Sequence, residues 1–380
     1  MFGLWRVAEK ELGNVKNVFK YGFGNQYTLE LERRCGRVFE TRYAVAVNSG
    51  TSALHCALVA VGVSPGDEVI TTPLTFAASG MCATYVGATP VFADVDPKTF
   101  NICSRSIEEN ITSKTKAIIV VALYGQPAEL EDICEVGRRH GIPIIEDNAQ
   151  CIRGYYRNRL AGSFGDIAIY SFQRSKHVTA GDGGMLATDN AEYAERARKF
   201  SCLGYSTLGA ETGGHVLRKE EMQHPSFNRH ATVGVNYRMP EVIAAILCAQ
   251  IERVGEFVEL RQEIAAEYWS AMERCSFAQA QYCPEHIESA RFCFSFALDT
   301  RRVSWNEFRG RFVERGGHSY FGAWQLTYKE PVFRGGYEEG LCPVAEDLQP
   351  RLVQLKTNFE SLEVGKEQAR VLKETLADFE

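Results

Sequence analysis

Residues 117–150 read AIIVVALYGQPAELEDICEVGRRHGIPIIEDNAQ. An apolar run at 117–123 opens this stretch and a second one at 143–146 closes it, and both have the length of strands. Between them, residues 128–140 alternate apolar and charged side chains in the way that is typical of an amphipathic helix. Strands without a polar face are buried on both sides. The stretch therefore predicts two parallel strands joined by a helix that covers the sheet.

The same alternation continues on both sides of this unit. Further short apolar runs predict strands at 44–47, 68–71, 90–93, 166–172 and 184–187, and helical stretches lie between them, for instance at 51–61 and 77–86. The prediction is an α/β fold with a mostly parallel seven-stranded sheet that is flanked by helices.

The second half of the chain has a different pattern. Residues 204–235 are polar and Gly-rich, which favours an excursion over the surface or across a subunit contact, and a long helix is predicted at about 240–270. We expect a large domain over residues 1–250 and a smaller α+β domain over 251–380. The N-terminal helix is a candidate to pack on the smaller domain.

The composition excludes several classes of protein. The 380 residues carry a net charge of −6, with 45% hydrophobic and 24% charged residues, which is ordinary for a folded soluble protein and excludes a disordered chain. No concentrated basic face indicates nucleic-acid binding, and no apolar run has the length of a membrane span, so we expect a cytoplasmic protein. The 12 cysteines form no CxxC pair, so no metal site is predicted.

Candidate functional residues follow the strands, because ligands of open parallel sheets collect at the carboxyl ends of the strands. After the first strand, the turn that holds Gly50, Thr51 and Ser52 leads into a helix and offers N–H groups and hydroxyls to an anion such as phosphate. An ordinary helix N-cap explains the same residues equally well.

Three further side chains are informative in the same way. Phe76 follows the strand at 68–71, and it is either a core ring or a flat surface for a cofactor. Asp147 follows Glu146 at the end of a strand, so only one of the two acids can face a given pocket, and a structural role remains an alternative. Lys176 lies in the loop beyond Ser171 and suits Schiff-base chemistry if its surroundings lower its pKa, although a single loop lysine is usually solvated.

Together these residues supply a phosphate cradle, an aromatic ring, a carboxylate, a hydroxyl and an amine. Those groups meet the needs of pyridoxal 5'-phosphate (PLP), whose pyridine nitrogen requires an acidic partner and whose aldehyde requires a lysine. The set predicts PLP, with its amino form pyridoxamine phosphate (PMP), as the cofactor.

At these residues the sequence resembles the DegT/StrS family of PLP-dependent sugar aminotransferases, which have fold type I of the aspartate aminotransferase superfamily. The resemblance covers nearly the whole chain, and its motifs occur in the family's order: NSGTSAL, GDEVITTPLTF, GATPVFADVDP, IIEDNAQ, GDIAIYSFQRSKHVTAGDGGM, GVNYRMPE and CPVAEDLQP. Each motif is weak by itself, but seven in order are specific.

The resemblance implies a role for each matching position. Lys176 would form the Schiff base, Asp147 would pair with the pyridine nitrogen, Gln150 would contact the phenolic oxygen, and Phe76 would stack on the ring. Contacts to the phosphate would come from Gly50, Thr51 and Ser171 and, from a partner subunit, Asn236, and Ser52 is a further candidate cofactor contact. A homodimer with shared active sites is therefore expected.

The implied activity is transfer of an amino group from glutamate or glutamine to a keto sugar by a ping-pong mechanism. A nucleotide-linked keto sugar is the favoured acceptor. Some family members carry His in place of the lysine and dehydrate sugars, and the presence of Lys176 favours transamination. A sugar dehydratase, a keto-cyclitol aminotransferase and a catalytically idle regulatory relative remain alternatives. A Rossmann-type nucleotide enzyme is disfavoured, because no GxGxxG follows the first strand. The candidate substrate contacts are Arg229, His230, Tyr320 and Trp324.

Overall fold

The computed structural model describes residues 6–24, 26–211, 219–318, 321–333 and 337–380. Its largest sheet has seven strands in the order β1-β9-β8-β5-β4-β2-β3. The pairs β2–β3, β2–β4, β4–β5 and β5–β8 are parallel, whereas β9 runs antiparallel to both β1 and β8. The predicted mostly parallel seven-stranded sheet is confirmed.

The elements of this sheet lie within about two residues of their predicted positions. The strands are β1 (Tyr43–Val47), β2 (Glu68–Thr71), β3 (Thr89–Phe92), β4 (Thr115–Val121), β5 (Ile144–Asp147), β8 (Ile167–Ser171) and β9 (Gly184–Thr188). The helices between and after them are α3 (Gly50–Ala60), α4 (Ala78–Tyr85), α5 (Ser104–Glu109), α6 (Leu130–His140) and α7 (Ala191–Ser201). The predicted strand at 117–123 ends earlier, because Leu123–Gly125 turns into a 3-10 helix (η2) in which Tyr124 has a φ of 60°.

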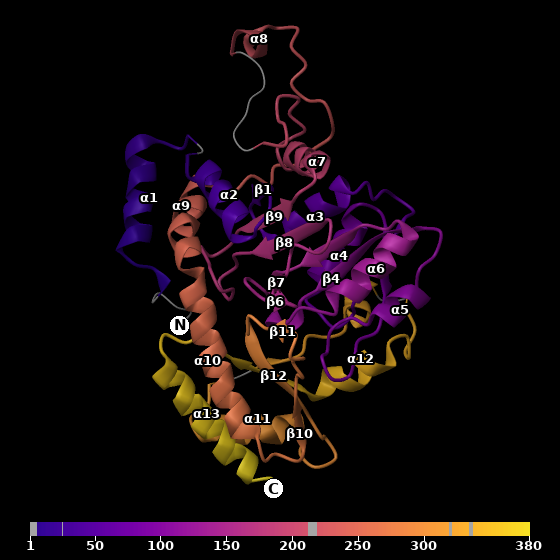
Figure 1. Cartoon of the computed structure of the whole chain (residues 1–380), viewed down its shortest axis with the longest axis vertical. Coiled ribbons are helices and arrows are strands. Elements are labelled where there is room, and N and C mark those ends of the chain that lie inside the picture. The colour runs from indigo at the N-terminus through magenta and orange to yellow at the C-terminus, as the bar shows by residue number, and fades with distance from the viewer. Residues whose placement is uncertain (1–5, 25, 212–218, 319–320, 334–336) are drawn as a thin grey trace.

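Two N-terminal helices and a long, nearly continuous helical segment lie beside the large sheet (Figure 1). Helices α1 (Glu9–Tyr21) and α2 (Gln26–Val38) both pack on α9 (Glu241–Gln250). The helix predicted at 240–270 consists of α9, a 3-10 turn at Ile251–Arg253 (η3), and α10 (Val254–Met272). The buried Glu241 carboxylate accepts hydrogen bonds from the main chain of Tyr27 and Thr28, which ties the start of α2 to α9.

Both faces of the large sheet are buried, as the apolar strands predict. Alternate residues of β4 and β5 enter different clusters: Ile118 and Ile144 lie in one, and Ile119 and Ile145 lie in the other. Helices α2, α5, α6 and α9 contribute side chains to the first cluster, and α3, α4 and α7 contribute to the second. The sheet is therefore the middle layer between two helical layers.

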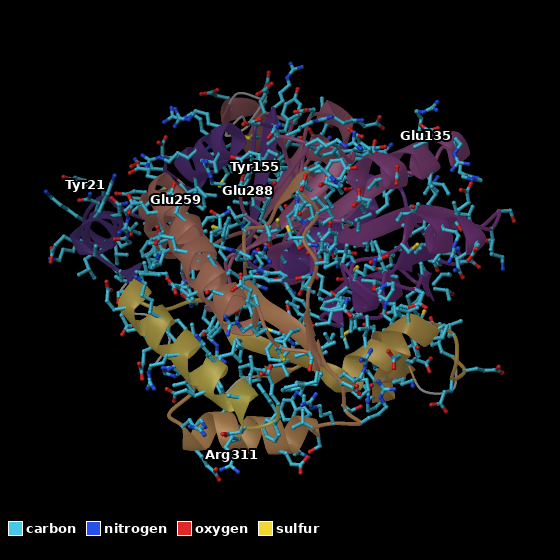
Figure 2. All side chains as sticks on the ribbon, turned by 60° about the horizontal axis from the view of Figure 1, so that its bottom comes forward. Tyr21, Glu135, Tyr155, Glu259, Glu288 and Arg311 are labelled. Atoms are coloured by element: carbon cyan, nitrogen blue, oxygen red, sulfur yellow. The ribbon has the colours of Figure 1, made fainter. Side chains whose placement is uncertain are left out.

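A second, antiparallel sheet lies below the large one in Figure 1. Its order is β10-β12-β14-β13, with β10 (Ala278–Ala280), β12 (Cys293–Leu298), β13 (Phe321–Gly322) and β14 (Leu352–Lys356). Its core is shared with α10, α11 (Trp305–Glu314) and α13 (Leu362–Ala377). Figure 2 turns this side of the molecule toward the viewer, with the exposed Arg311 of α11 at its lower margin.

Short elements join the two sheets. A three-stranded sheet pairs β11 (Ile287–Glu288) with β6 (Tyr155–Tyr156), which in turn pairs with β7 (Arg159–Leu160). The chain between β13 and β14 contains the 3-10 turns η4 (Thr327–Lys329), η5 (Pro331–Phe333) and η6 (Gln349–Arg351) and the helix α12 (Pro343–Leu348). Asp94 accepts hydrogen bonds from the main-chain N–H groups of Val344 and Ala345, so the start of α12 is held at the edge of the large sheet.

The described residues of the polar excursion predicted at 204–235, which are 204–211 and 219–235, form an arm that projects from the body of the protein in Figure 1, with the short α8 (Lys219–Gln223) at its far end. Val233 is 90% exposed. Over the part of the chain that the structure describes, no helix combines the length and the hydropathy that crossing a membrane requires.

Candidate active site

A cavity of about 360 Å³ opens at the carboxyl ends of the parallel strands. Its walls come from the turn after β1, the segment after β2, the ends of β5 and β8, and the loop after β8. Most of the predicted cofactor residues line this one cavity: Gly50, Thr51, Phe76, Asp147, Gln150, Ser171 and Lys176, with the predicted substrate contact Trp324.

Lys176 lies in the loop after β8, and its side chain is largely buried among the residues of the cavity. Burial lowers the pKa of its amine to about 8, although the nearby Asp147 carboxylate acts in the opposite direction. The amine nitrogen lies 4.6 Å from the centre of the Phe292 ring. A lysine with this pKa has a substantial uncharged fraction near neutral pH, which is the form that attacks an aldehyde.

Asp147 is the last residue of β5 and is 4% exposed. Its carboxylate accepts a hydrogen bond of 2.8 Å from the Ser79 hydroxyl and one of 3.1 Å from the main-chain N–H of Ala149. Burial raises the pKa of Asp147, while these two donors and the Lys176 charge oppose that rise. A buried carboxylate of this kind is stabilised further by a cationic or N–H partner in the cavity.

The structure decides which of the two adjacent acids faces the cavity. Glu146 points to the other side of β5, where its carboxylate accepts hydrogen bonds from the main-chain N–H groups of Gly162, Phe164 and Gly165 at 2.6–2.8 Å. Glu146 therefore holds the loop before β8, and Asp147 is the acid that lines the cavity.

The start of α3 forms the end of the cavity that suits an anion. Ser49 is the N-cap residue, and its hydroxyl oxygen accepts a hydrogen bond from the Ser52 N–H. A Cβ on Gly50 would lie 2.8 Å from the Cβ of Ser171, so this turn needs glycine to approach the end of β8. The Ser52 hydroxyl donates to Asn48 at 2.6 Å, and Ser52 is absent from the described lining.

Two aromatic rings stand at the cavity. Phe76 and Trp324 are 55% and 40% exposed, and their rings meet edge to face with centroids 5.4 Å apart. A 3.0 Å hydrogen bond from the Thr327 N–H to the Pro73 carbonyl ties the segment that carries Trp324 to the segment that carries Phe76. The buried Gln150 side-chain oxygen accepts a hydrogen bond from the Tyr124 N–H at 2.9 Å.

The remaining candidates lie elsewhere. Asn236 is exposed and pairs through its main chain with Cys202. Arg229 and His230 lie on the projecting arm, where the His230 ring stacks on Tyr205 with centroids 5.0 Å apart. None of these three lines this chain's cavity over the described residues, and Tyr320 lies outside the described residues.

Sequence reasoning missed several residues of the cavity. Thr75 and Ser79 lie close to the predicted Phe76, and Asp182 lies in the Gly-rich turn after the predicted Lys176. Their closeness in sequence to predicted site residues could have identified them. Phe292 comes from the start of the second sheet, more than 100 positions after Lys176. No local pattern connects these two residues. Gln173 and Ser175 also line the cavity.

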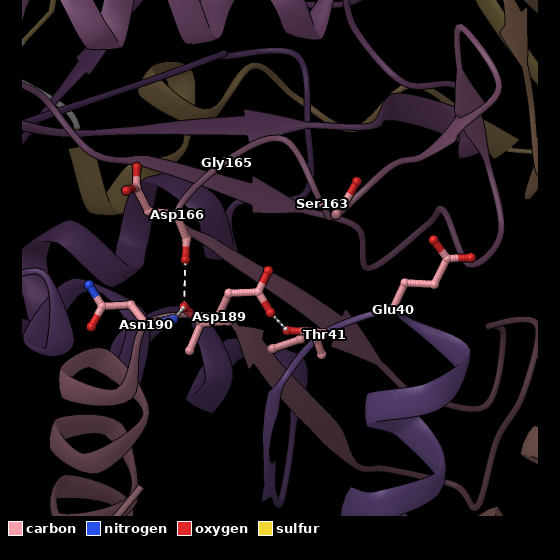
Figure 3. A pocket seen from close by; sticks show the side chains of 10 residues that line it. Glu40, Thr41, Ser163, Gly165, Asp166, Asp189 and Asn190 are labelled. Atoms are coloured by element: carbon pink, nitrogen blue, oxygen red, sulfur yellow. Dashed lines mark hydrogen bonds between the residues drawn. The ribbon is translucent and has the colours of Figure 1, made fainter.

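A second cavity, of about 400 Å³, lies at the opposite edge of the large sheet, before β1 and β8 (Figure 3). Two of its carboxylates, those of Asp166 and Asp189, already have partners in the protein. Asp189 accepts hydrogen bonds from the Thr41 hydroxyl and the Arg42 N–H, and Asp166 accepts one from the Ile144 N–H. Among the described residues that line this cavity none carries an amine, whereas the first cavity has the Lys176 amine and the Asp147 carboxylate.

The donor set of the first cavity fits PLP. The helix N-terminus at Gly50 suits a phosphate, the buried Asp147 oxygens suit a ring N–H, and the Lys176 amine suits an aldehyde. Each of these groups belongs to a different strand end, so the cavity exists only in the folded chain.

Comparison with known proteins agrees with this chemistry. Residues 6–374 match the model of the DegT/DnrJ/EryC1/StrS aminotransferase family. A GDP-perosamine synthase of Caulobacter vibrioides is 40% identical over 66% of this chain, and the match spans 62% of that protein. A pleiotropic regulatory protein of Geobacillus stearothermophilus is 34% identical over 93% of this chain and 89% of its own length.

Solved structures show the same architecture. DesV of S. venezuelae, determined in complex with a ketimine intermediate, is 27% identical and covers 97% of this chain and 93% of its own, with a TM-score of 0.85. The sheet order, the cavity and the family match agree, and the chain belongs to the DegT/DnrJ/EryC1/StrS aminotransferase family.

Proposed function

We propose that this protein transfers an amino group from glutamate or glutamine to a nucleotide-linked keto sugar. The observation that carries the proposal is the meeting of Lys176 and Asp147 in one cavity, where burial lowers the pKa of the lysine to about 8. The resemblance of the chain to GDP-perosamine synthases supports a nucleotide-linked sugar as the acceptor.

When bound, PLP supplies an electron sink that stabilises negative charge at the carbon beside the transferred nitrogen. Lys176 would hold the cofactor through its aldehyde, and its amine would move a proton as a general base and then as a general acid. Asp147 would hold the proton on the pyridine nitrogen, and the Ser79 hydroxyl and the Ala149 N–H fix the direction of its carboxylate.

The other cofactor contacts follow from position. Gly50, Thr51 and Ser171 border the part of the cavity that suits the phosphate. Phe76 lines the same cavity, and we propose that its ring stacks on the ring of the cofactor. Asn236 is exposed on this chain, which agrees with a role in the active site of a second subunit. The proposal therefore includes a homodimer with shared sites.

Substrate contacts are proposed for two regions. Trp324 borders the cavity and offers a flat apolar surface to a sugar ring. Arg229 and His230 lie on the projecting arm, and a partner subunit's arm could bring the same basic groups to the phosphates of a nucleotide.

The reaction divides into two half-reactions, and each one tests the proposal. Adding glutamate or glutamine to the PLP-loaded protein without an acceptor is expected to remove the visible absorbance of the bound cofactor and to release the matching keto acid. Adding a nucleotide-linked keto sugar is then expected to restore the absorbance and to place nitrogen in the sugar. If neither donor releases a keto acid, the proposal is wrong.

The same experiment separates the alternatives. A product that loses a hydroxyl group and gains no nitrogen would identify a sugar dehydratase. Return of the absorbance with a keto cyclitol, and with no keto sugar, would identify a keto-cyclitol aminotransferase.

A further inference from the structure

Two arginines lie under the loop that carries Lys176. Arg6 precedes α1 and is 1% exposed, and Arg261 is in the middle of α10 and is 3% exposed. They are 255 positions apart in the sequence, yet both guanidinium groups donate hydrogen bonds to main-chain carbonyls of the same short segment, residues 174–176. Buried guanidinium groups are costly, and their placement here requires an explanation.

Arg6 contacts main-chain carbonyls at Lys176 and on both sides of it in the sequence. Its guanidinium donates hydrogen bonds to the carbonyls of Arg174 at 2.9 Å and His177 at 3.2 Å, and also to the carbonyl of Lys176 itself. The ring of His177 is buried as well, and its Nε2 donates to the Ala290 carbonyl at 2.8 Å. The main chain on both sides of the lysine is therefore held.

Arg261 completes this arrangement from the other side. One of its nitrogens donates to the carbonyls of Ser175 at 3.2 Å and Lys176 at 3.1 Å, and another donates to the carbonyl of Phe292 at 2.8 Å. Arg261 thus joins the lysine loop to Phe292, whose ring lies 4.6 Å from the Lys176 amine. Within the described residues, the hydrogen bonds of Arg261 go to main-chain carbonyls.

We propose that Arg6 and Arg261 are positioning residues for Lys176, and that their guanidinium groups hold the carbonyls of residues 174–177 so that the lysine amine stays aimed at the cavity. This inference rests on the proposed role of Lys176. It assigns the short segment before α1 and the middle of α10 to the active site, although neither residue is in the described lining of the cavity.

The charges around the amine give the proposal a second consequence. The groups that face Lys176 are Asp147 on β5, Arg261 on α10 and Cys293 on β12, with His177 next to it in the chain. The positive charge of Arg261 lowers the pKa of Lys176, and the Asp147 charge raises it. Loss of the Arg261 charge is therefore expected to raise the pKa of the amine, whereas loss of the Arg6 contacts acts through the main chain.

The test uses the full chain without cofactor, in the variants Arg6→Gln, Arg261→Gln and Arg261→Lys. Hydrogen exchange of peptides that contain residues 173–178 is expected to become at least about tenfold faster in both Gln variants, with little change elsewhere. Competitive acetylation of Lys176 with an isotope-labelled anhydride, measured across a pH series, reports the pH midpoint of amine deprotonation. This midpoint is expected to be higher in Arg261→Gln and near the original value in Arg261→Lys, which keeps the positive charge.

The matched control is Arg302→Gln. Arg302 also donates to main-chain carbonyls, those of Phe379 and Glu380, but at the far end of the chain. Unchanged exchange at residues 173–178 in a folded Arg6→Gln protein would overturn the proposal, and this variant decides the matter if the Arg261 variants do not fold. Because these measurements need no cofactor, they are independent of whether the proposed transamination occurs.

Discussion

The pKa of Lys176 gives the most quantitative prediction. With a pKa of about 8, about one amine in eleven is uncharged at pH 7, whereas the ordinary lysine value of 10.5 leaves about one in three thousand. The structure therefore predicts that Lys176 reacts about 300-fold faster at pH 7 than an exposed lysine of equal intrinsic nucleophilicity. The variant Asp147→Asn removes a negative charge that raises this pKa, so it is expected to move the midpoint below 8.

The assay is competitive acetylation of the cofactor-free protein with isotope-labelled anhydride, followed by peptide mass spectrometry at each pH. Exposed lysines such as Lys10 serve as internal references. Asp182→Asn is the matched control, because Asp182 also lines the cavity but is not among the groups that shift the pKa of Lys176. A midpoint at or above pH 10 for Lys176, or an upward shift in Asp147→Asn, would refute the reasoning.

Four further substitutions follow from the same geometry. Asp147→Ala is expected to keep bound cofactor but to lower kcat at least about 100-fold, and near-normal turnover would argue against its contact with the ring nitrogen. Gly50→Ala places a Cβ 2.8 Å from that of Ser171 and is expected to weaken PLP binding about tenfold or more, as measured by equilibrium titration; unchanged affinity would contradict the close approach. Trp324→Ala is expected to raise KM for the keto sugar up to about tenfold and to leave KM for the amino donor unchanged, so equal effects on both would move Trp324 out of the acceptor site. Glu146→Gln is expected to lower the free energy of unfolding by about 1–3 kcal/mol in a urea titration while the spectrum of the bound cofactor stays the same; full stability would show that three N–H groups do not need the carboxylate.

The large sheet could be predicted from the sequence because its signals are local. Each strand is a short apolar run, and the turn chemistry after it marks the end within about two residues, as at β2 and β5. The long helix at 240–270 was predicted as one piece, but a 3-10 turn at Ile251–Arg253 divides it. No Pro or Gly lies in that turn, so composition carried no signal for the break.

The candidate site could be predicted where it follows strand ends. Asp147 ends β5 and Lys176 follows β8, and these strands are neighbours in the sheet, so the two side chains line the same cavity. The choice between Asp147 and Glu146 needed the fold, because both acids are buried and only the hydrogen-bond partners separate their roles.

Other parts of the site depend on contacts between distant segments. Phe292 reaches the cavity from the second sheet, and Arg261 reaches the lysine loop from α10. The local sequence around each residue is that of an ordinary strand or helix. Such residues become visible only when the chain is folded.

The covalent attachment point of PLP tests the central claim most directly. The PLP-loaded protein would be reduced with borohydride, digested and mapped by mass spectrometry. The account predicts that the reduced cofactor is found on Lys176. Recovery of the label on another lysine, or of no labelled peptide from a protein saturated with PLP, would contradict it.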